Sequence, residues 1–221
     1  MHRQDFKNLE KVLKKTTKKM NILEVGCGIG SNLEFLISKG YNNVSGTDIS
    51  DKMLDISRKK GLNVKPASQI FNEDLKYDIL LISHVIEHME FEKLQTFLDS
   101  YFSLLSDKGI VIIITPLLTD RFYTDIDHVK PYNIDALLRL YCESEDFSRS
   151  YYPNYTIQLI DIYFRRERYD ILNSRIRYFD NIWNKTVYTF IKIFFMALKF
   201  VSFGIMSRAT GYTAILKVSK F

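Results

Sequence analysis

Cysteine is scarce in this chain: Cys27 and Cys142 are the only two among 221 residues. Two cysteines so far apart provide neither a disulfide framework nor a metal-binding cysteine pair. The stretch Met1–Lys7 is charged and no apolar h-region follows it, so the sequence predicts no signal peptide. It contains no internal repeat and no low-complexity linker. Together these absences favour one globular domain in a reducing, cytoplasmic compartment.

Acidic residues are missing from the C-terminal part, because no Asp or Glu follows Asp180. The whole chain carries a net charge of +5, which suits an acidic partner without requiring one. With 46% apolar residues, the chain is globular rather than disordered. No RNA-binding module is recognised, and no N-P-P-[YF]-type tetrapeptide follows the predicted fourth strand. We therefore expect no nucleic-acid partner.

A glycine-rich loop, Gly26–Gly30, follows the first apolar run of the chain. Residues 22–25 predict a buried strand, and a helix is expected from 31 to about 39. Glycines let a backbone approach a ligand where a Cβ would collide, and a helix N-terminus presents free N–H groups. Ser31 stands where the third glycine of a dinucleotide fingerprint would fall, which disfavours a nicotinamide cofactor.

Two acids accompany this loop: Glu24 inside the strand, and Asp48 at the end of a second predicted strand, residues 43–48. An acid at that place can accept both hydroxyls of a ribose. The segments Glu24–Gly30 and Gly46–Ser50 together resemble class I S-adenosylmethionine-dependent methyltransferases. The resemblance implies S-adenosylmethionine as cofactor, with the glycine loop around its methionyl part and Asp48 on its ribose.

The same resemblance points to the residues that contact the cofactor. The loop 66–76 would lie beside the adenine, where Ala67, Ser68 and Gln69 are candidates. Ser83 and His84 end a later strand, and ligands of open α/β sheets gather at such strand ends. The predicted cofactor-binding residues are Glu24, Gly26, Cys27, Gly28, Gly30, Asp48, Ile49, Ser68, Ser83 and His84.

Further periodic segments predict the rest of the fold. Additional strands are expected at 62–65, 77–83, 110–115, 155–168 and 212–218, and additional helices at 3–19, 50–60, 90–105 and 133–141. A turn at Ser106–Gly109 precedes the fifth strand. A run such as 77–83, apolar on both faces, is typical of a parallel sheet. With the resemblance, this predicts a single α/β domain, residues 1–221. It is a three-layer, Rossmann-like methyltransferase fold with seven mostly parallel strands and an antiparallel last strand.

The segment His84–His88 reads His-Val-Ile-Glu-His. It matches an inverzincin metalloprotease pattern, which we disfavour because the segment directly follows an apolar strand. Three interpretations of Glu87 and His88 remain: helix capping and pocket lining, a metal site, or a direct catalytic role. Quinone O-methyltransferases hold a divalent metal with a Glu-x-x-Glu-His stretch. Here His84 takes the first place, so we predict no metal ligand.

Methyl transfer to a hydroxyl or amine requires that the acceptor lose a proton, and an imidazole with a pKa near 7 suits that task. His128 and His88 are the catalytic candidates. The segment His128–Tyr132, in a polar and aromatic loop 117–132, resembles a methyltransferase branch that includes the ubiquinone-biosynthesis O-methyltransferases. The alternative for His128 is a loop residue that forms only local hydrogen bonds.

A helical insertion, residues 170–210, separates the last two predicted strands. Large apolar residues dominate 182–207, and Lys185, Lys192 and Lys199 share one helical stripe. This amphipathic pattern predicts a helix in a membrane interface. Packing on the same domain or in a homodimer is the alternative. A membrane span is disfavoured, because a central lysine costs roughly 2.5–3.5 kcal/mol and one crossing cannot return the chain to the sheet.

The predicted function is transfer of a methyl group from S-adenosylmethionine to an oxygen of a small or lipid-linked acceptor, such as a quinone precursor or a glycan intermediate. Two other classes remain open. One is a nicotinamide-dependent oxidoreductase, and the other is a non-catalytic membrane- or partner-binding module on the same fold. The expected location is the cytoplasm, with peripheral membrane contact through residues 182–207.

Overall fold

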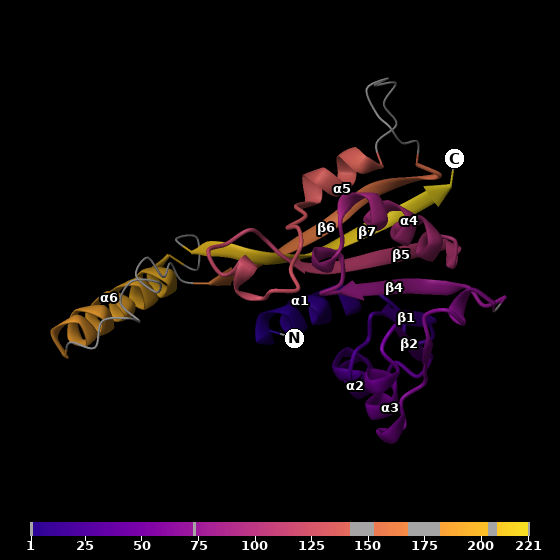
Figure 1. Ribbon diagram of the computed structural model, residues 1–221, viewed down its shortest axis with the longest axis horizontal. Coiled ribbons are helices and arrows are strands. Elements are labelled where there is room, and N and C mark those ends of the chain that lie inside the picture. Colours follow the sequence, from indigo (N-terminus) through magenta and orange to yellow (C-terminus); the bar gives the residue numbers. More distant parts are fainter. Residues whose placement is uncertain (1, 73, 142–152, 168–181, 203–206, 221) are drawn as a thin grey trace. The chain divides into compact units, whose positions relative to one another are not determined.

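The computed structural model describes residues 2–72, 74–141, 153–167, 182–202 and 207–220 (Figure 1). Seven strands form one sheet in the order β3-β2-β1-β4-β5-β7-β6. Neighbouring strands from β3 to β5 pair in parallel, and β7 pairs antiparallel with β5. The strands are β1 (Ile22–Val25), β2 (Val44–Asp48), β3 (Val64–Pro66), β4 (Tyr77–Ser83), β5 (Leu105–Pro116), β6 (Tyr155–Glu167) and β7 (Arg208–Lys220).

Helices cover both faces of the sheet. One buried cluster joins strand residues such as Leu23 and Leu80 to the helices α4 and α5. The adjacent strand residues Ile22 and Ile79 belong to a second cluster with α1, α2 and α3. This alternation confirms the predicted three-layer α/β fold. The helices are α1 (Arg3–Leu13), α2 (Ser31–Ser38), α3 (Asp51–Lys59), α4 (Phe91–Phe102), α5 (Ile134–Leu140) and α6 (Ile182–Val201), with 3-10 turns η1 (Ile70–Asn72), η2 (Ile86–His88) and η3 (Phe122–Thr124).

Several predicted boundaries are wrong, including the end of the helix predicted at 90–105, which stops at Phe102. Helix α1 ends at Leu13 rather than at residue 19, because hydroxyls of Thr16 and Tyr41 donate to the Leu13 carbonyl, each at 2.9 Å. The predicted turn Ser106–Gly109 lies inside β5. There the pairing with β4 shifts register between Tyr77 and Ile79, which accommodates the extra residues as an irregularity rather than a turn. The predicted end of the strand at Pro116 is confirmed.

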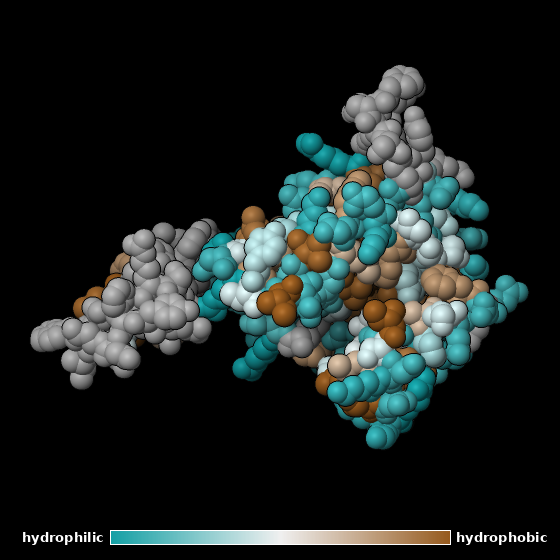
Figure 2. Space-filling model, in the orientation of Figure 1, coloured by the Kyte–Doolittle hydropathy of each residue, from teal (hydrophilic) through white to brown (hydrophobic). Residues whose placement is uncertain are grey.

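The chain divides into two compact units, residues 1–164 with 211–221, and residues 165–210. The second unit overlaps the predicted insertion, and its residues 168–181 and 203–206 lie outside the described part. Within it, α6 exposes several large apolar side chains, Val187, Phe190, Ile193, Phe194, Met196, Phe200 and Val201. None of the described helices combines the length and the apolar character that crossing a bilayer requires. Elsewhere, hydrophilic side chains cover much of the described surface in view (Figure 2).

Candidate active site

The loop after β1 forms a tight cradle at the carboxyl end of the sheet. The backbone N–H groups of Gly26 and Cys27 both donate to the Thr47 carbonyl at the end of β2, at 2.8 and 3.0 Å. Gly26 has a φ of +71°, and a Cβ there would lie 2.5 Å from Cγ2 of Val85. Gly30 has a φ of 78° and is the N-cap of α2. Both positions therefore require glycine. Glycines of this kind are typical of a loop whose backbone closely approaches a ligand.

Asp48 joins this loop to the end of β2. One carboxylate oxygen accepts from the backbone N–H of Gly28 at 2.8 Å, and the other accepts from the backbone N–H of Ser50 at 2.9 Å. Each oxygen keeps a lone pair for a further donor. The next residue, Ile49, is 93% exposed, so an apolar side chain stands free beside the carboxylate. The backbone N–H of Ala67 donates to the Asp48 carbonyl at 3.0 Å, which places the predicted adenine loop next to this strand end.

Glu24 is buried at the base of the cradle, with an exposed fraction of 1%. Its Oε1 accepts from the Asn32 side-chain amide at 2.6 Å. Its Oε2 has no hydrogen-bond partner in the described part of the chain. Burial and the nearby Asp48 charge raise the pKa of Glu24 to about 8, although the Asn32 hydrogen bond opposes the shift. A buried carboxylate with an unused oxygen suits a cationic ligand group, which would restore its charge.

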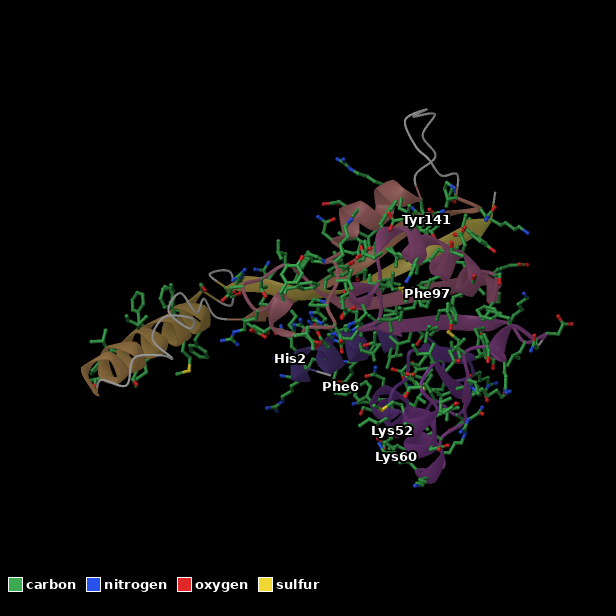
Figure 3. The ribbon with its side chains drawn as sticks, viewed as in Figure 1. His2, Phe6, Lys52, Lys60, Phe97 and Tyr141 are labelled. Atoms are coloured by element: carbon green, nitrogen blue, oxygen red, sulfur yellow. The ribbon has the colours of Figure 1, made fainter. Side chains whose placement is uncertain are left out.

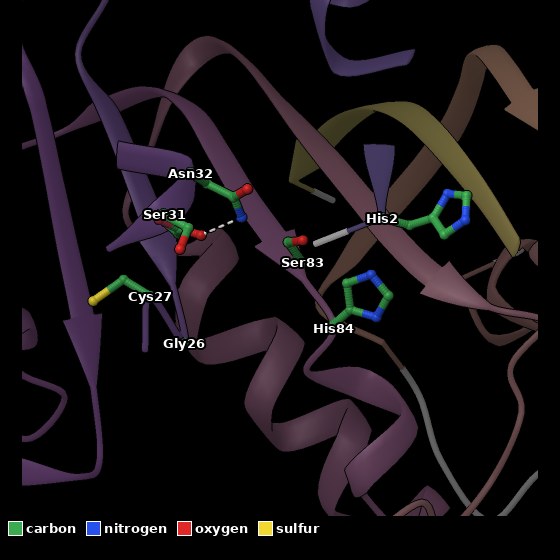
Figure 4. A pocket seen from close by; sticks show the side chains of 8 residues that line it. His2, Gly26, Cys27, Ser31, Asn32, Ser83 and His84 are labelled. Atoms are coloured by element: carbon green, nitrogen blue, oxygen red, sulfur yellow. Dashed lines mark hydrogen bonds between the residues drawn. The ribbon is translucent and has the colours of Figure 1, made fainter. Parts of the chain in front are cut away.

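A pocket of about 510 Å³ opens beside Glu24, within the range of about 300–1,000 Å³ that is usual for small-molecule sites. Figure 4 shows His2 and His84 on one side of it, and Cys27, Ser31 and Asn32 on the other, with Ser83 between them. Five predicted residues line this pocket: Glu24, Gly26, Cys27, Ser83 and His84. The other five are not among its lining residues: Gly28, Gly30, Asp48, Ile49 and Ser68.

Three lining residues were missed from the sequence: His2, Ser31 and Asn32. The two on α2 follow the glycine loop directly, so position alone could have indicated them. His2 comes from the start of α1, and no local pattern places that helix at the pocket. Cys27 is no nucleophile, because burial and the nearby charges of Glu24 and Asp48 raise its pKa to about 12.

His84 lies between two buried carboxylates. Its Nδ1 is 3.0 Å from Oε1 of Glu87, and its Nε2 is 3.4 Å from Oδ2 of Asp5 on α1. Burial alone would lower the pKa of His84, but the hydrogen bonds and charges of Asp5 and Glu87 outweigh burial and raise it to about 9. The backbone of His84 adopts a φ of 57°, a left-handed conformation that a residue with a Cβ adopts at some cost.

The two predicted catalytic histidines lie next to each other and are not among the residues that line the pocket. The ring centroids of His88 and His128 are 5.1 Å apart. Nδ1 of His88 is 2.9 Å from the Asp127 carbonyl, and Nδ1 of His128 is 2.7 Å from the Phe122 carbonyl. A carbonyl only accepts, so each Nδ1 carries the proton, and Nε2 has the free lone pair in the neutral ring.

Glu87 contacts both His84, which lines the pocket, and the loop that carries His128. Its carboxylate accepts from His84 on one side and from the Thr115 hydroxyl, at 3.1 Å, on the other. Its backbone carbonyl accepts from the N–H groups of Val129 and Lys130, which fixes the loop that carries His128. The arrangement therefore holds both imidazoles in place before any acceptor arrives.

Glu87, His88 and His128 could also hold a metal ion. Each offers one ligand atom, and these atoms lie within 4.8 Å of one another. Both histidines donate through Nδ1 to a carbonyl, as metal-ligating histidines usually do. Each Glu87 oxygen accepts one hydrogen bond, and the Asp125 carboxylate lies 3.7 Å from Nε2 of His128. The sequence predicts no metal here, and that stays a prediction.

Comparisons with known proteins agree with this geometry. A family described as a methyltransferase domain matches residues 1–179. No curated protein matches the chain. A SAM-dependent methyltransferase from Archaeoglobus fulgidus superposes with a TM-score of 0.63 at 23% identity, over 97% of this chain and 93% of that one.

Two further solved structures share the fold. The YcgJ protein from Bacillus subtilis has a TM-score of 0.59 at 12% identity, over 100% of both chains. Magnesium protoporphyrin IX methyltransferase from Synechocystis PCC 6803, with bound SAM, has a TM-score of 0.54 at 14% identity, over 98% of this chain and 79% of that one. The narrower resemblance to the ubiquinone branch is not confirmed by these matches. The fold and the glycine cradle support S-adenosylmethionine as cofactor, and the chain belongs to the methyltransferase-domain family.

Proposed function

We propose that the protein transfers a methyl group from S-adenosylmethionine to an oxygen of a small, apolar or lipid-linked acceptor, such as a quinone precursor or a glycan intermediate. The observation that carries the proposal is the buried, unshared Oε2 of Glu24 at the base of a glycine cradle, in a chain of the methyltransferase-domain family. The cofactor supplies a methyl carbon that is already electrophilic, so the protein has to align the acceptor and manage its proton.

On the cofactor side, each group of the cradle has a matching task. Glu24 offers Oε2 to the ammonium of the methionyl part, and Gly26 lets the backbone pass close to it. The remaining lone pairs of Asp48 can accept the two ribose hydroxyls. The exposed Ile49 side chain can cover an adenine ring, which would bury apolar surface on both partners.

On the acceptor side, the loop after β5 exposes apolar side chains, with Leu118 and Tyr123 each 60% and Ile126 93% exposed. Such a surface suits an acceptor with an apolar body. Nε2 of His128 or of His88 can accept the hydroxyl proton, because Nδ1 of each ring is committed to a carbonyl. The two histidines would then activate the acceptor oxygen as general bases.

Helix α6 offers a way to reach a lipid-linked acceptor. It exposes apolar side chains, and its sequence has lysines and no acidic residue. We propose that the enzyme works in the cytoplasm and binds an anionic membrane surface through α6. Deletion of residues 182–207 should abolish co-sedimentation with phosphatidylglycerol vesicles. Unchanged co-sedimentation would refute membrane contact, and a change from dimer to monomer would favour a homodimer instead.

The test of the central proposal is calorimetric titration of the purified protein with S-adenosylmethionine and, separately, with NADH. We expect micromolar binding of S-adenosylmethionine and loss of that binding in Asp48→Ala. Binding of NADH instead would favour the oxidoreductase alternative, which family membership disfavours. A folded protein that binds neither compound would favour a non-catalytic binding module.

A further inference from the structure

The start of α1 forms part of the pocket wall. His2 is the N-cap of this helix and lines the pocket, although most of the lining comes from residues 24–32 and 83–84. The helix is anchored by Leu9, Val12 and Leu13, which are buried in the cluster shared with α2 and α3. Figure 3 labels His2 and Phe6 near the N-terminal end of α1. Any movement of this end of α1 would therefore change the pocket.

A partly buried contact joins this end of α1 to His84, the residue that directly follows β4. Asp5 lies in the first turn of α1 with an exposed fraction of 0%, and its Oδ2 is 3.4 Å from Nε2 of His84. His84 is in turn held by Glu87 at 3.0 Å and by its own left-handed backbone. Asp5 does not line the pocket, so its carboxylate can influence a bound ligand only through His84 and the position of α1.

Other contacts of α1 join it to α2, away from His84. The rings of Phe6 and Phe35 have centroids 4.8 Å apart, and Nζ of Lys39 is 2.6 Å from Oε1 of Glu10. The Lys39–Glu10 pair is half-exposed, with side-chain exposures of 35% and 41%. Breaking an exposed pair of this kind changes stability little. It therefore provides a control for the contact of His84 with the fully buried Asp5.

We propose that His84 is a positioning residue that, through Asp5, holds the start of α1 closed against the cofactor pocket. The inference rests on the proposed function only for the identity of the ligand. A bound cofactor can then leave only when this end of α1 moves, so the Asp5–His84 contact slows its dissociation. A weaker contact between Asp5 and His84 therefore raises KM for the cofactor.

The direct test measures S-adenosylmethionine dissociation by stopped flow in the full chain. Asp5→Asn and His84→Asn should each raise the dissociation rate and the Kd about tenfold, since changes within one complex appear mainly in dissociation. Asparagine tolerates the left-handed backbone at position 84. The double variant should release S-adenosylmethionine no faster than the faster of the two single variants. That result would show that the two residues act together. Glu10→Gln should stay within about twofold of wild type.

Unchanged dissociation in the folded variants, or additive effects in the double variant, would overturn the proposal. Hydrogen exchange tests it without relying on cofactor binding. In the ligand-free protein, Asp5→Asn should speed exchange of the amides in the first two turns of α1, while the α5 amides stay unchanged. Equal exchange rates in α1 would also overturn it. If wild type does not bind S-adenosylmethionine, the proposed function fails, and this exchange experiment still decides the role of Asp5.

Discussion

On the cofactor side of the site, backbone atoms and glycines shape the binding surface, whereas on the proposed acceptor side imidazoles and a carboxylate do. The cradle is fixed by N–H groups of Gly26 and Cys27 that donate to the Thr47 carbonyl. The acceptor side depends on the Nδ1 atoms of His88 and His128, which donate to carbonyls and leave Nε2 free. A surface made of backbone atoms suits a cofactor that is the same in every enzyme of the family. A surface made of side chains suits an acceptor that differs between enzymes.

The largest expected effect comes from the acceptor side. His128→Ala should lower kcat by about 10²–10⁴, the usual contribution of a positioned general base. The Kd for S-adenosylmethionine should stay within about twofold, because His128 does not line the cofactor pocket. Single-turnover kinetics and calorimetric titration measure the two quantities. Equal turnover in the variant would remove His128 from the mechanism.

His128→Asn is the matched control for this experiment. Its side-chain amide can donate to the Phe122 carbonyl as Nδ1 of His128 does at 2.7 Å, but it cannot take up a proton. We expect turnover as low as in His128→Ala, with a smaller loss of stability. Treatment with EDTA should leave wild-type turnover unchanged if the histidines act as bases. Loss of turnover that Zn²⁺ restores would instead identify Glu87, His88 and His128 as metal ligands.

The next effect tests the cofactor side. Gly26→Ala should weaken S-adenosylmethionine binding at least about tenfold, because its Cβ would lie 2.5 Å from Cγ2 of Val85 and the glycine loop would have to shift. Gly40→Ala provides the comparison, since Gly40 has a φ of +86° with nothing within 4 Å of a Cβ. That variant should lose similar backbone stability and keep its cofactor affinity. Similar affinities in both variants would show that the cradle geometry does not matter.

The contrast between the two sides also explains what the sequence could predict. The cradle lies within residues 21–50, where strand, glycines, helix and acid follow one another, so local patterns were sufficient. Sequence patterns also named His88 and His128 as separate candidates. Their closeness depends on hydrogen bonds between the Glu87 carbonyl and the loop at Val129 and Lys130, about which neither local segment carries a signal.

The position of α1 at the pocket wall could not be predicted from the sequence, for the same reason. Asp5 and His84 are far apart in sequence, and their contact exists only because α1 packs across the strands beside the pocket. The lysine-rich segment after Leu13 predicted more helix, but two hydroxyls that cap the Leu13 carbonyl end it. One of these belongs to Tyr41, a tertiary contact that helical periodicity cannot show.

A smaller effect reports directly on Glu24. Its pKa of about 8 lies above the ordinary value of 4.5, so the free folded protein binds a proton that the unfolded chain releases. The contribution of Glu24 protonation to the free energy of unfolding is therefore fully present below pH 4.5 and is lost as the pH rises through 8. A cofactor ammonium beside Oε2 would lower this pKa again. Binding at pH 6.5 should thus release close to one proton, because an α-amino group with a pKa of about 7.7–8.0 is already charged there.

Calorimetry in buffers with different ionisation enthalpies measures this release. At pH 9 Glu24 is already largely ionised in the free protein, so its contribution to proton release should nearly vanish. Glu24→Gln removes the titrating group and keeps an oxygen that can accept from the Asn32 amide. It should bind the cofactor more weakly and without proton release. An enthalpy independent of the buffer in wild type at pH 6.5 would mean that the ammonium does not meet Glu24, and the cofactor side would then have to bind through Asp48 and the backbone alone.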